Sequence, residues 1–223
     1  MPKTRLDALL VERGLFASRS QAAAAVLAGE VRLGEDGRRA DKPGRLVPED
    51  LSVAVSERPA YVSRGGIKLA NALAAFGLDP GGRRCLDLGA STGGFTDCLL
   101  QRGATAVVAV DVAYGELDWR LRGEPRVTVL ERTNARGLRP EDLPYRPELV
   151  VADLSFISLA KVLPAAVACA AERFDLLALV KPQFEAGRDR VGRGGVVRSA
   201  DDRRAALVAT GAAARELGLA VRG

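Results

Sequence analysis

The chain has 223 residues, of which 48% are hydrophobic and 27% are charged, and its formal net charge is +5. These values are typical of a soluble globular protein with one large core or two unequal domains. No stretch of about 18 uninterrupted apolar residues is available to cross a bilayer, and the charges scattered through residues 1–25 exclude a secretory signal. We therefore expect a cytoplasmic protein.

The residue types restrict the chemistry further. Histidine is absent, and the three cysteines, Cys85, Cys98 and Cys169, form no CxxC pair. Nucleophile pairs that depend on histidine and histidine-based metal sites are therefore excluded, and we expect no metal. Proton transfer falls to Lys, Asp, Glu, Tyr or Cys. Only five of the 33 basic residues are lysines, and lysine, unlike arginine, can lose a proton near neutral pH.

Residues 4–55 predict a compact helix-helix-hairpin unit. Leu6, Leu9 and Leu10 keep helical spacing up to Gly14. A second helix begins at Ser18, with Gln21 in the capping-box position, and ends at Gly29. Short β-like pieces follow at 31–33 and 51–55. We place this first domain at residues 1–57 and a linker at 58–62.

The pattern RLDxLLVxRGLxxSRSxAxxxxxxGxVxL in this unit resembles the small RNA-binding domain named after ribosomal small-subunit protein four. The resemblance implies that four residues face structured RNA: Arg5, Arg13, Arg19 and Ser20. Arg19 would lie at a helix N-terminus, which suits phosphate. The alternative is that these residues form a charged face that contacts only solvent. Residues 1–60 hold ten basic and nine acidic residues, so this part of the chain has almost no net positive charge to attract RNA.

Residues 63–223 predict an α/β domain with a Rossmann-like, doubly wound sheet. A helix at 63–77 precedes apolar runs at 84–88, 107–110, 126–130, 149–152 and 176–180, which alternate with helical patterns. Such alternation indicates a parallel sheet with helices on both faces. A helix at 201–217 precedes the strand-like LAVRG at the chain's end. We therefore expect the sheet to lack its last strand and the 223 residues to be a fragment or a weakly active form.

The turn after the first predicted strand, LDLGASTGGF, lies where such sheets bind ligands. Gly89 permits a tight turn, and Gly93 and Gly94 open the next helix without a Cβ. A dinucleotide site requires G-x-G-x-x-G, and Ser91 stands where the middle glycine belongs, which disfavours a dehydrogenase. The order D-x-G-x-x-x-G-G-F instead looks like the S-adenosylmethionine motif of methyltransferases. The alternative is that this glycine-rich turn serves only the packing of the fold and binds no ligand.

The candidate cofactor contacts are assigned from this placement. Asp111, at the end of the second strand, is expected to take the two ribose hydroxyls. Asn134 follows the third strand, where the same fold usually contacts adenine. The full set of expected cofactor-binding residues is Asp87, Gly89, Ala90, Ser91, Gly93, Gly94, Phe95, Asp111 and Asn134.

Three charged residues are expected at the same edge of the sheet as this turn. Lys68 lies in SRGGIK on the helix before the first strand, Asp153 ends the fourth strand in VVADLSFISL, and Lys181 ends the fifth in LLALVKPQFE. Each adjoins an apolar element that should be buried, so solvation alone is a poor explanation for them.

Together, SRGxxK, LDLGASTGGFTD, VxADLSFISL and LVKPQFE make the whole chain resemble the TlyA-type ribosomal RNA methyltransferases, also called haemolysin A, which have an FtsJ-like catalytic domain. The resemblance implies 2′-O-methylation of cytidine in ribosomal RNA, S-adenosyl-L-methionine as cofactor, and ribosomal RNA or ribosomal subunits as partner. It also implies a Lys-Asp-Lys-Glu tetrad, whose first three members match Lys68, Asp153 and Lys181. The fourth has no counterpart here, and Glu185 belongs to the KPQFE loop.

The chemistry of methyl transfer to a hydroxyl gives these residues roles. The reaction must align oxygen, methyl and sulfur and remove one proton. Our hypothesis is that Lys181 takes this proton, helped by burial and by the positive charge of Lys68, while Asp153 orients it.

The segment EAGRDRVGRGGVVR, residues 185–198, belongs to the part of the chain with the largest basic excess. Our hypothesis is that it forms a mobile loop that closes over RNA phosphates. The alternative is a solvated loop without a ligand. The RNA-binding candidates outside the first domain are Arg64, Arg188, Arg190, Arg193 and Arg198.

Two other functions stay open. A non-catalytic RNA-binding protein with a relic cofactor site would also explain both domains. A haemolysin acting on membranes is suggested by the family's other name, although no basic amphipathic segment suited to a bilayer surface is evident.

Overall fold

The computed structural model describes residues 2–55 and 60–222. The chain divides into two compact units, residues 1–59 and 60–223. The boundary that we expected at residue 57, and residues 58–59 of the expected linker, lie outside the described residues. The rest of that linker adjoins the second unit, where Tyr61 and Val62 pack against the core.

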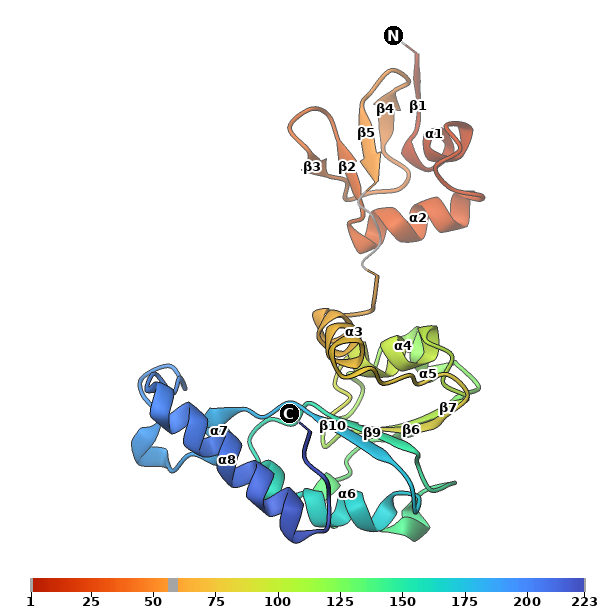
Figure 1. Cartoon of the computed structure of the whole chain (residues 1–223). Helices are drawn as coiled ribbons and strands as arrows, with labels where there is room; N and C mark the ends of the chain where they lie inside the picture. The colour runs from red at the N-terminus through yellow and green to blue at the C-terminus, as the bar shows by residue number, and fades with distance from the viewer. Residues whose placement is uncertain (1, 56–59, 223) are drawn as a thin grey trace. The chain divides into compact units, whose positions relative to one another are not determined.

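The first unit combines two helices with two small antiparallel sheets (Figure 1). Its second helix begins and ends as expected: the Ser18 hydroxyl accepts from the Gln21 N–H, and Gly29 ends the helix with φ +77°. The core is built from Leu6, Leu10, Val26 and Val31. In chain order the elements are β1 Lys3–Arg5, α1 Leu6–Glu12, α2 Arg19–Ala28, β2 Val31–Leu33, β3 Arg38–Arg39, β4 Leu46–Pro48 and β5 Val53–Val55.

The second unit is built on a five-stranded parallel sheet, which confirms the α/β prediction. The strands lie in the order β10 (Asp175–Ala178), β9 (Leu149–Ala152), β6 (Arg84–Leu88), β7 (Ala106–Val110) and β8 (Val127–Leu130). The first strand, β6, is central, and the chain builds the sheet outward from it in both directions. The order reverses between β6 and β9, which is where a doubly wound sheet binds its ligands.

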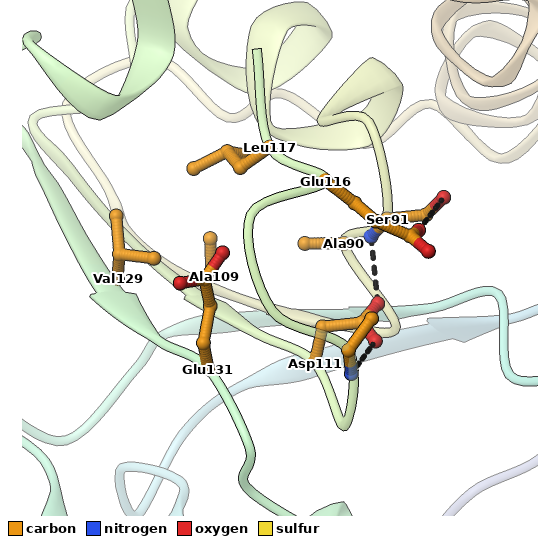
Figure 2. Close-up of a pocket in the computed structure, with 9 residues that line it drawn as sticks. Ala90, Ser91, Ala109, Asp111, Glu116, Leu117, Val129 and Glu131 are labelled. Carbon is orange, nitrogen blue, oxygen red and sulfur yellow. Dashed lines mark hydrogen bonds between the residues drawn. The ribbon is translucent and has the colours of Figure 1, made fainter. Parts of the chain in front are cut away.

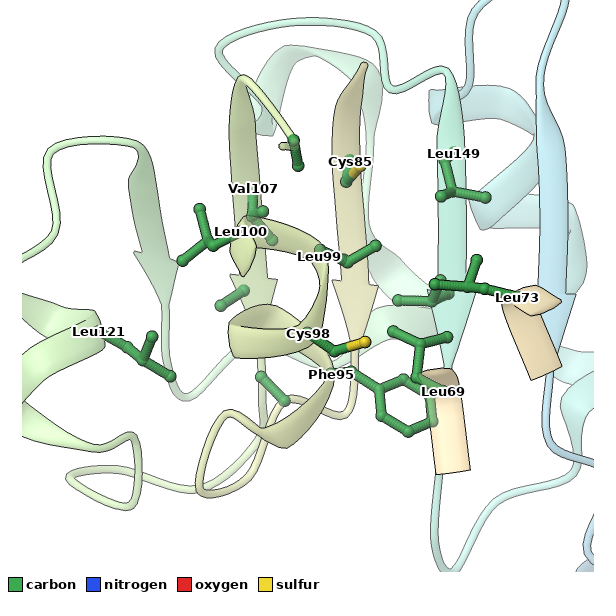
Figure 3. Packing of buried hydrophobic residues seen from close by; sticks show 14 of the residues in the cluster. Leu69, Leu73, Cys85, Phe95, Cys98, Leu99, Leu100, Val107, Leu121 and Leu149 are labelled. Carbon is green, nitrogen blue, oxygen red and sulfur yellow. The ribbon is translucent and has the colours of Figure 1, made fainter. Parts of the chain in front are cut away.

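Helices cover both faces of this sheet (Figure 1). On one face, α3 (Arg64–Phe76) and α4 (Gly94–Gln101) pack Leu69, Leu73 and Leu99 over Cys85 and Leu149 (Figure 3). On the other face, α6 (Leu163–Cys169) lies over β6 and β9. All three cysteines are free and buried, as is common for cysteines outside disulfides and metal sites. The remaining elements are α5 Trp119–Arg122, η1 Ala135–Gly137, η2 Pro140–Asp142, η3 Leu159–Lys161, α7 Pro182–Glu185, η4 Arg188–Arg190 and α8 Ala200–Glu216.

At the β10 edge, the described part of the chain has no further strand. Residues 219–222, where a strand was expected to begin, have no strand conformation. A groove of about 740 Å³ lies here, lined by apolar side chains of β10, α6 and α8. The residues of β10 are accordingly half-buried, whereas those of its neighbour β9 are fully buried.

Within residues 2–55 and 60–222, no helix is both long enough and apolar enough to cross a membrane.

Candidate functional site

Two amines meet one carboxylate where the strands of the large sheet end. The Lys181 Nζ lies 2.6 Å from Asp153 Oδ1, and the Lys68 Nζ lies 3.4 Å from Asp153 Oδ2. Asp153 and Lys181 are 17% and 19% exposed, whereas Lys68 is 56% exposed. The structure thus brings together the three residues that the sequence placed at one edge, and each carboxylate oxygen contacts one amine.

The glycines of the turn after β6 allow this arrangement. Gly89 has φ +88°, and a methyl group on it would lie 2.9 Å from the Asp153 carbonyl oxygen. A methyl on Gly94 would lie 2.8 Å from the Gly66 N and closer still to the Ser63 hydroxyl. Both distances are too short for a real Cβ. Gly89 therefore lets the segment holding Asp153 approach β6, and Gly94 lets α3, which carries Lys68, pack on α4.

Asp87 is the most unusual carboxylate in the turn. It is fully buried, and its Oδ2 accepts a 2.7 Å hydrogen bond from the Thr96 hydroxyl. Its Oδ1 is buried with no hydrogen-bond partner in the described part of the molecule. Burial raises the pKa of Asp87 to about 7, and the negative charges of Asp153 and Asp111 act in the same direction. An orphaned buried oxygen of this kind fits a positively charged ligand group.

A small hollow of about 10 Å³ lies between the turn that follows β6 and the carboxyl ends of β7 and β8 (Figure 2). Its lining includes Ala90, Ser91 and Asp111, three of the residues predicted to bind the cofactor. It also includes Glu116 and Glu131, which the sequence reasoning missed. Glu131 directly follows β8, just as Asp111 follows β7, so its position at a strand end was the available signal.

Asp111 has hydrogen-bond partners within the protein. Its Oδ2 accepts from the Ser91 N–H at 2.7 Å and its Oδ1 from the Ala113 N–H at 2.8 Å. Ser91 itself has φ +47°, and its hydroxyl bonds to Glu116. The carboxylate therefore holds the turn in place, and a ribose contact would have to use the remaining lone pairs.

Phe95 and Asn134, two other residues expected to contact the cofactor, also contact other parts of the protein. The Phe95 ring is 8% exposed and lies in the core with Leu69 (Figure 3). The Asn134 Oδ1 accepts from the Arg136 N–H at 3.0 Å and begins η1, which leaves its amide nitrogen for a ligand. The role of both residues toward a cofactor stays a prediction.

The loops after β9 and β10 hold further residues that the sequence reasoning did not select. Ser155 accepts a 2.8 Å hydrogen bond from the Lys181 amine. Phe156 is 92% exposed with φ +64°, which is strained for a residue other than glycine, and its ring centroid lies 5.4 Å from that of Phe184. Glu185 accepts from the Ser158 hydroxyl and the Leu159 N–H, both at 2.7 Å.

In the first unit, a buried carboxylate organises two of the predicted RNA-binding arginines. Asp7 is 4% exposed and accepts two hydrogen bonds from Arg5, at 2.8 and 3.0 Å, and two longer ones from Arg19. The hydrogen bonding from Arg5 lowers the pKa of Asp7 to about 2. Arg13 instead donates to the backbone oxygens of Glu49 and Leu51. Ser20 is exposed at the start of α2.

The other RNA candidates lie on the second unit. Arg64 is exposed one helical turn before Lys68 on α3, so both occupy the same face of that helix. Arg193 and Arg198 are exposed, and Arg190 pairs with Asp202 of α8 at 3.3 Å. Arg188 belongs to η4, and its side chain lies outside the described part of the structure.

Comparison with known proteins places this geometry in a family. The model of the FtsJ-like methyltransferases matches residues 61–208, and that of the S4 domain matches residues 4–53. The "16S/23S rRNA (cytidine-2'-O)-methyltransferase TlyA" of Mycobacterium tuberculosis is 56% identical over 218 residues, covering 97% of this chain and 81% of its own length. "Hemolysin A" of Brachyspira hyodysenteriae is 38% identical, covering 87% and 80%.

A solved structure described as a hemolysin from Streptococcus thermophilus is 43% identical and superimposes with a TM-score of 0.73. It covers all of this chain and 82% of that chain. With the family model matched across the large sheet and its lysine–aspartate cluster, the chain belongs to the FtsJ-like methyltransferases, in the TlyA group that carries an N-terminal S4 domain.

Proposed function

We propose that this protein transfers a methyl group from S-adenosyl-L-methionine to the ribose 2′-hydroxyl of cytidine in ribosomal RNA, in the cytoplasm. The single observation that carries the proposal is the contact of Lys68 and Lys181 with the two oxygens of Asp153. The names of the relatives support the substrate, since the relative from M. tuberculosis is named for cytidine 2′-O-methylation of 16S and 23S rRNA.

The residues present fit the cofactor. S-adenosylmethionine, when bound, supplies a methyl group on a positively charged sulfur and needs no further activation. The orphaned Oδ1 of Asp87 suits the amino group at the methionine end. The hollow beside the turn has only about 10 Å³, so it does not itself hold a nucleoside, but the carboxylates of Asp111 and Glu131 at its lining suit the hydroxyl groups of the nucleoside end.

The remaining task of the protein is to position the ribose hydroxyl and to accept its proton. Lys181 is the candidate base, because its amine is largely shielded from water and lies between Asp153 and Ser155. Asp153 orients both amines, one on each oxygen. Lys68 is the more exposed of the two amines and is suited to hold the RNA ribose or its phosphate.

The RNA has three contact regions in this proposal. The paired arginines of the first unit provide charge for phosphates. Arg64 extends the basic surface beside Lys68. Phe156 offers an exposed ring next to the cluster on which an unpaired base can stack, as aromatic side chains commonly do in RNA recognition.

Methyl transfer separates this function from the other two candidates. Purified protein, labelled S-adenosylmethionine and unmethylated ribosomal subunits should give label in RNA at ribose 2′ positions of cytidine. Incorporation at background level would favour a non-catalytic RNA-binding protein. Leakage of liposome contents caused by the protein would favour a membrane-active haemolysin.

The role of Lys181 is tested by Lys181→Arg. Arginine keeps the positive charge but stays protonated at neutral pH, so it is not able to accept the hydroxyl proton. We expect this variant to bind S-adenosylmethionine and RNA with little change and to transfer no methyl group. A wild-type rate at neutral pH would exclude Lys181 as the base.

A further inference from the structure

The two loops that follow β9 and β10 are joined along their length by side-chain contacts. Lys181 contacts Asp153 at 2.6 Å and Ser155 at 2.8 Å at one end of this junction. The Phe156 and Phe184 rings meet in the middle. At the other end, Glu185 accepts from the Ser158 hydroxyl and from the backbone of η3.

Within this junction, the Lys181 amine has two partners of different character: an ion-pair contact with Asp153 and a hydrogen bond to Ser155. Asp153 is a carboxylate and carries charge, whereas Ser155 is a neutral hydroxyl on an exposed residue. A lysine amine rotates freely about its last bond, and an ion pair alone does not fix that rotation. The hydrogen bond to Ser155 fixes it, and together the two contacts leave a single remaining direction at the nitrogen.

We infer that Ser155 is a positioning residue for Lys181, whose hydroxyl fixes the amine so that its remaining direction faces the ribose 2′-hydroxyl. This inference rests on the function proposed above. A hydroxyl is suited to the task because it accepts a hydrogen bond without adding negative charge.

A matched control lies three residues further along the same loop. The Ser158 hydroxyl donates to Glu185 and has no contact with Lys181 among the hydrogen bonds of the described residues. Ser155→Ala and Ser158→Ala thus each remove one hydroxyl from one loop, and only the first removes an acceptor from the amine. If loop integrity were all that mattered, the two variants would behave alike.

The test uses the full chain with ribosomal subunits and S-adenosylmethionine, and measures kcat and KM across pH. For Ser155→Ala we expect kcat to fall on the order of 10- to 100-fold, as for loss of a hydrogen bond to a charged group. The pH at which the rate rises should also move, while the KM for RNA and the affinity for S-adenosylmethionine stay unchanged. Ser158→Ala should lower the melting temperature without moving the pH profile.

A second pair of variants separates the effect of the hydroxyl from that of side-chain volume. Ser155→Thr and Ser155→Val have nearly the same volume and differ in the hydroxyl, so Thr should restore most of the activity and Val should not. Equal activity of these two variants, or a wild-type pH profile in Ser155→Ala, would overturn the inference. An inactive wild-type protein would instead overturn the proposed function. A wild-type rate for Lys181→Arg would exclude Lys181 as the base, and this inference with it, while leaving methyl transfer in place.

Discussion

The buried carboxyl of Asp87 should make the stability of the fold depend on pH. Its pKa is raised from 3.8 to about 7 because the carboxyl is fully buried, and hydrogen bonding from Thr96 offsets this effect only in part. A carboxyl with a raised folded pKa leaves stability unaffected at a pH below its unfolded pKa, where both states are protonated. As the pH rises above 3.8, the unfolded state gives up its proton first, so the folded state becomes progressively less stable.

The size of this loss can be worked out for the ligand-free protein. Each pKa unit corresponds to about 1.4 kcal/mol, so the shift destabilises the fold by roughly 1.5 kcal/mol at pH 5 and roughly 4 kcal/mol at pH 8. Asp87→Asn removes the titration and keeps an oxygen for the Thr96 hydroxyl. The free energy of unfolding of Asp87→Asn minus that of the wild type should therefore be larger at pH 8 than at pH 5 by roughly 2.5 kcal/mol.

Urea unfolding of both proteins at a series of pH values measures this difference. The unsatisfied amide hydrogens of Asn add a constant cost, so the change with pH is the decisive quantity. Thr96→Val is a useful companion, because losing the hydroxyl that lowers the pKa of Asp87 should extend the pH dependence upward. A difference between Asp87→Asn and wild type that stays flat from pH 5 to 8 would refute the reasoning.

Three further predictions concern RNA. Phe156→Ala should reduce methyl transfer on the order of tenfold through loss of base stacking, and Phe156→Tyr should not, when the two are compared in the labelled assay. Asp7→Asn should weaken RNA binding in filter assays, because the two arginines lose the charge that holds them; unchanged affinity would contradict this. Replacing Arg193 and Arg198 by Gln should lower the slope of log affinity against log salt by about 1 to 2, and an unchanged slope would favour a solvated loop.

The elements of the large sheet were predictable because burial leaves a strong signal in sequence. Strands covered on both faces are continuous apolar runs, and the helix ends at Ser63 and Gly77 carry a cap and a stop signal. β1, Lys3–Arg5, was missed because it contains no apolar residue. Its strand conformation depends on antiparallel pairing with β4, a contact between segments about 40 residues apart.

The closeness of Asp153 and Lys181 was also predictable, because the residues that follow the carboxyl ends of parallel strands lie at one edge of the sheet. Hydrogen-bond partners were not predictable in this way. Asp111 stands at the end of β7 as expected, yet both of its oxygens bond to backbone N–H groups of neighbouring turns. Ser155 and Phe156 were overlooked for a related reason, since their importance depends on contacts with Lys181 and Phe184 across two loops.

The glycines of the turn after β6 connect these observations. The sequence predicted a tight turn at Gly89 and a helix start without a Cβ at Gly94, and in the structure protein atoms occupy the space that side chains at these two positions would fill. Beside Gly89 lies the Asp153 carbonyl, and beside Gly94 lies the start of α3. Since these neighbours carry the carboxylate and Lys68, a methyl group at either glycine would displace part of the lysine–aspartate cluster. The motif that predicts a cofactor site is therefore also the motif that allows the lysine–aspartate cluster to form.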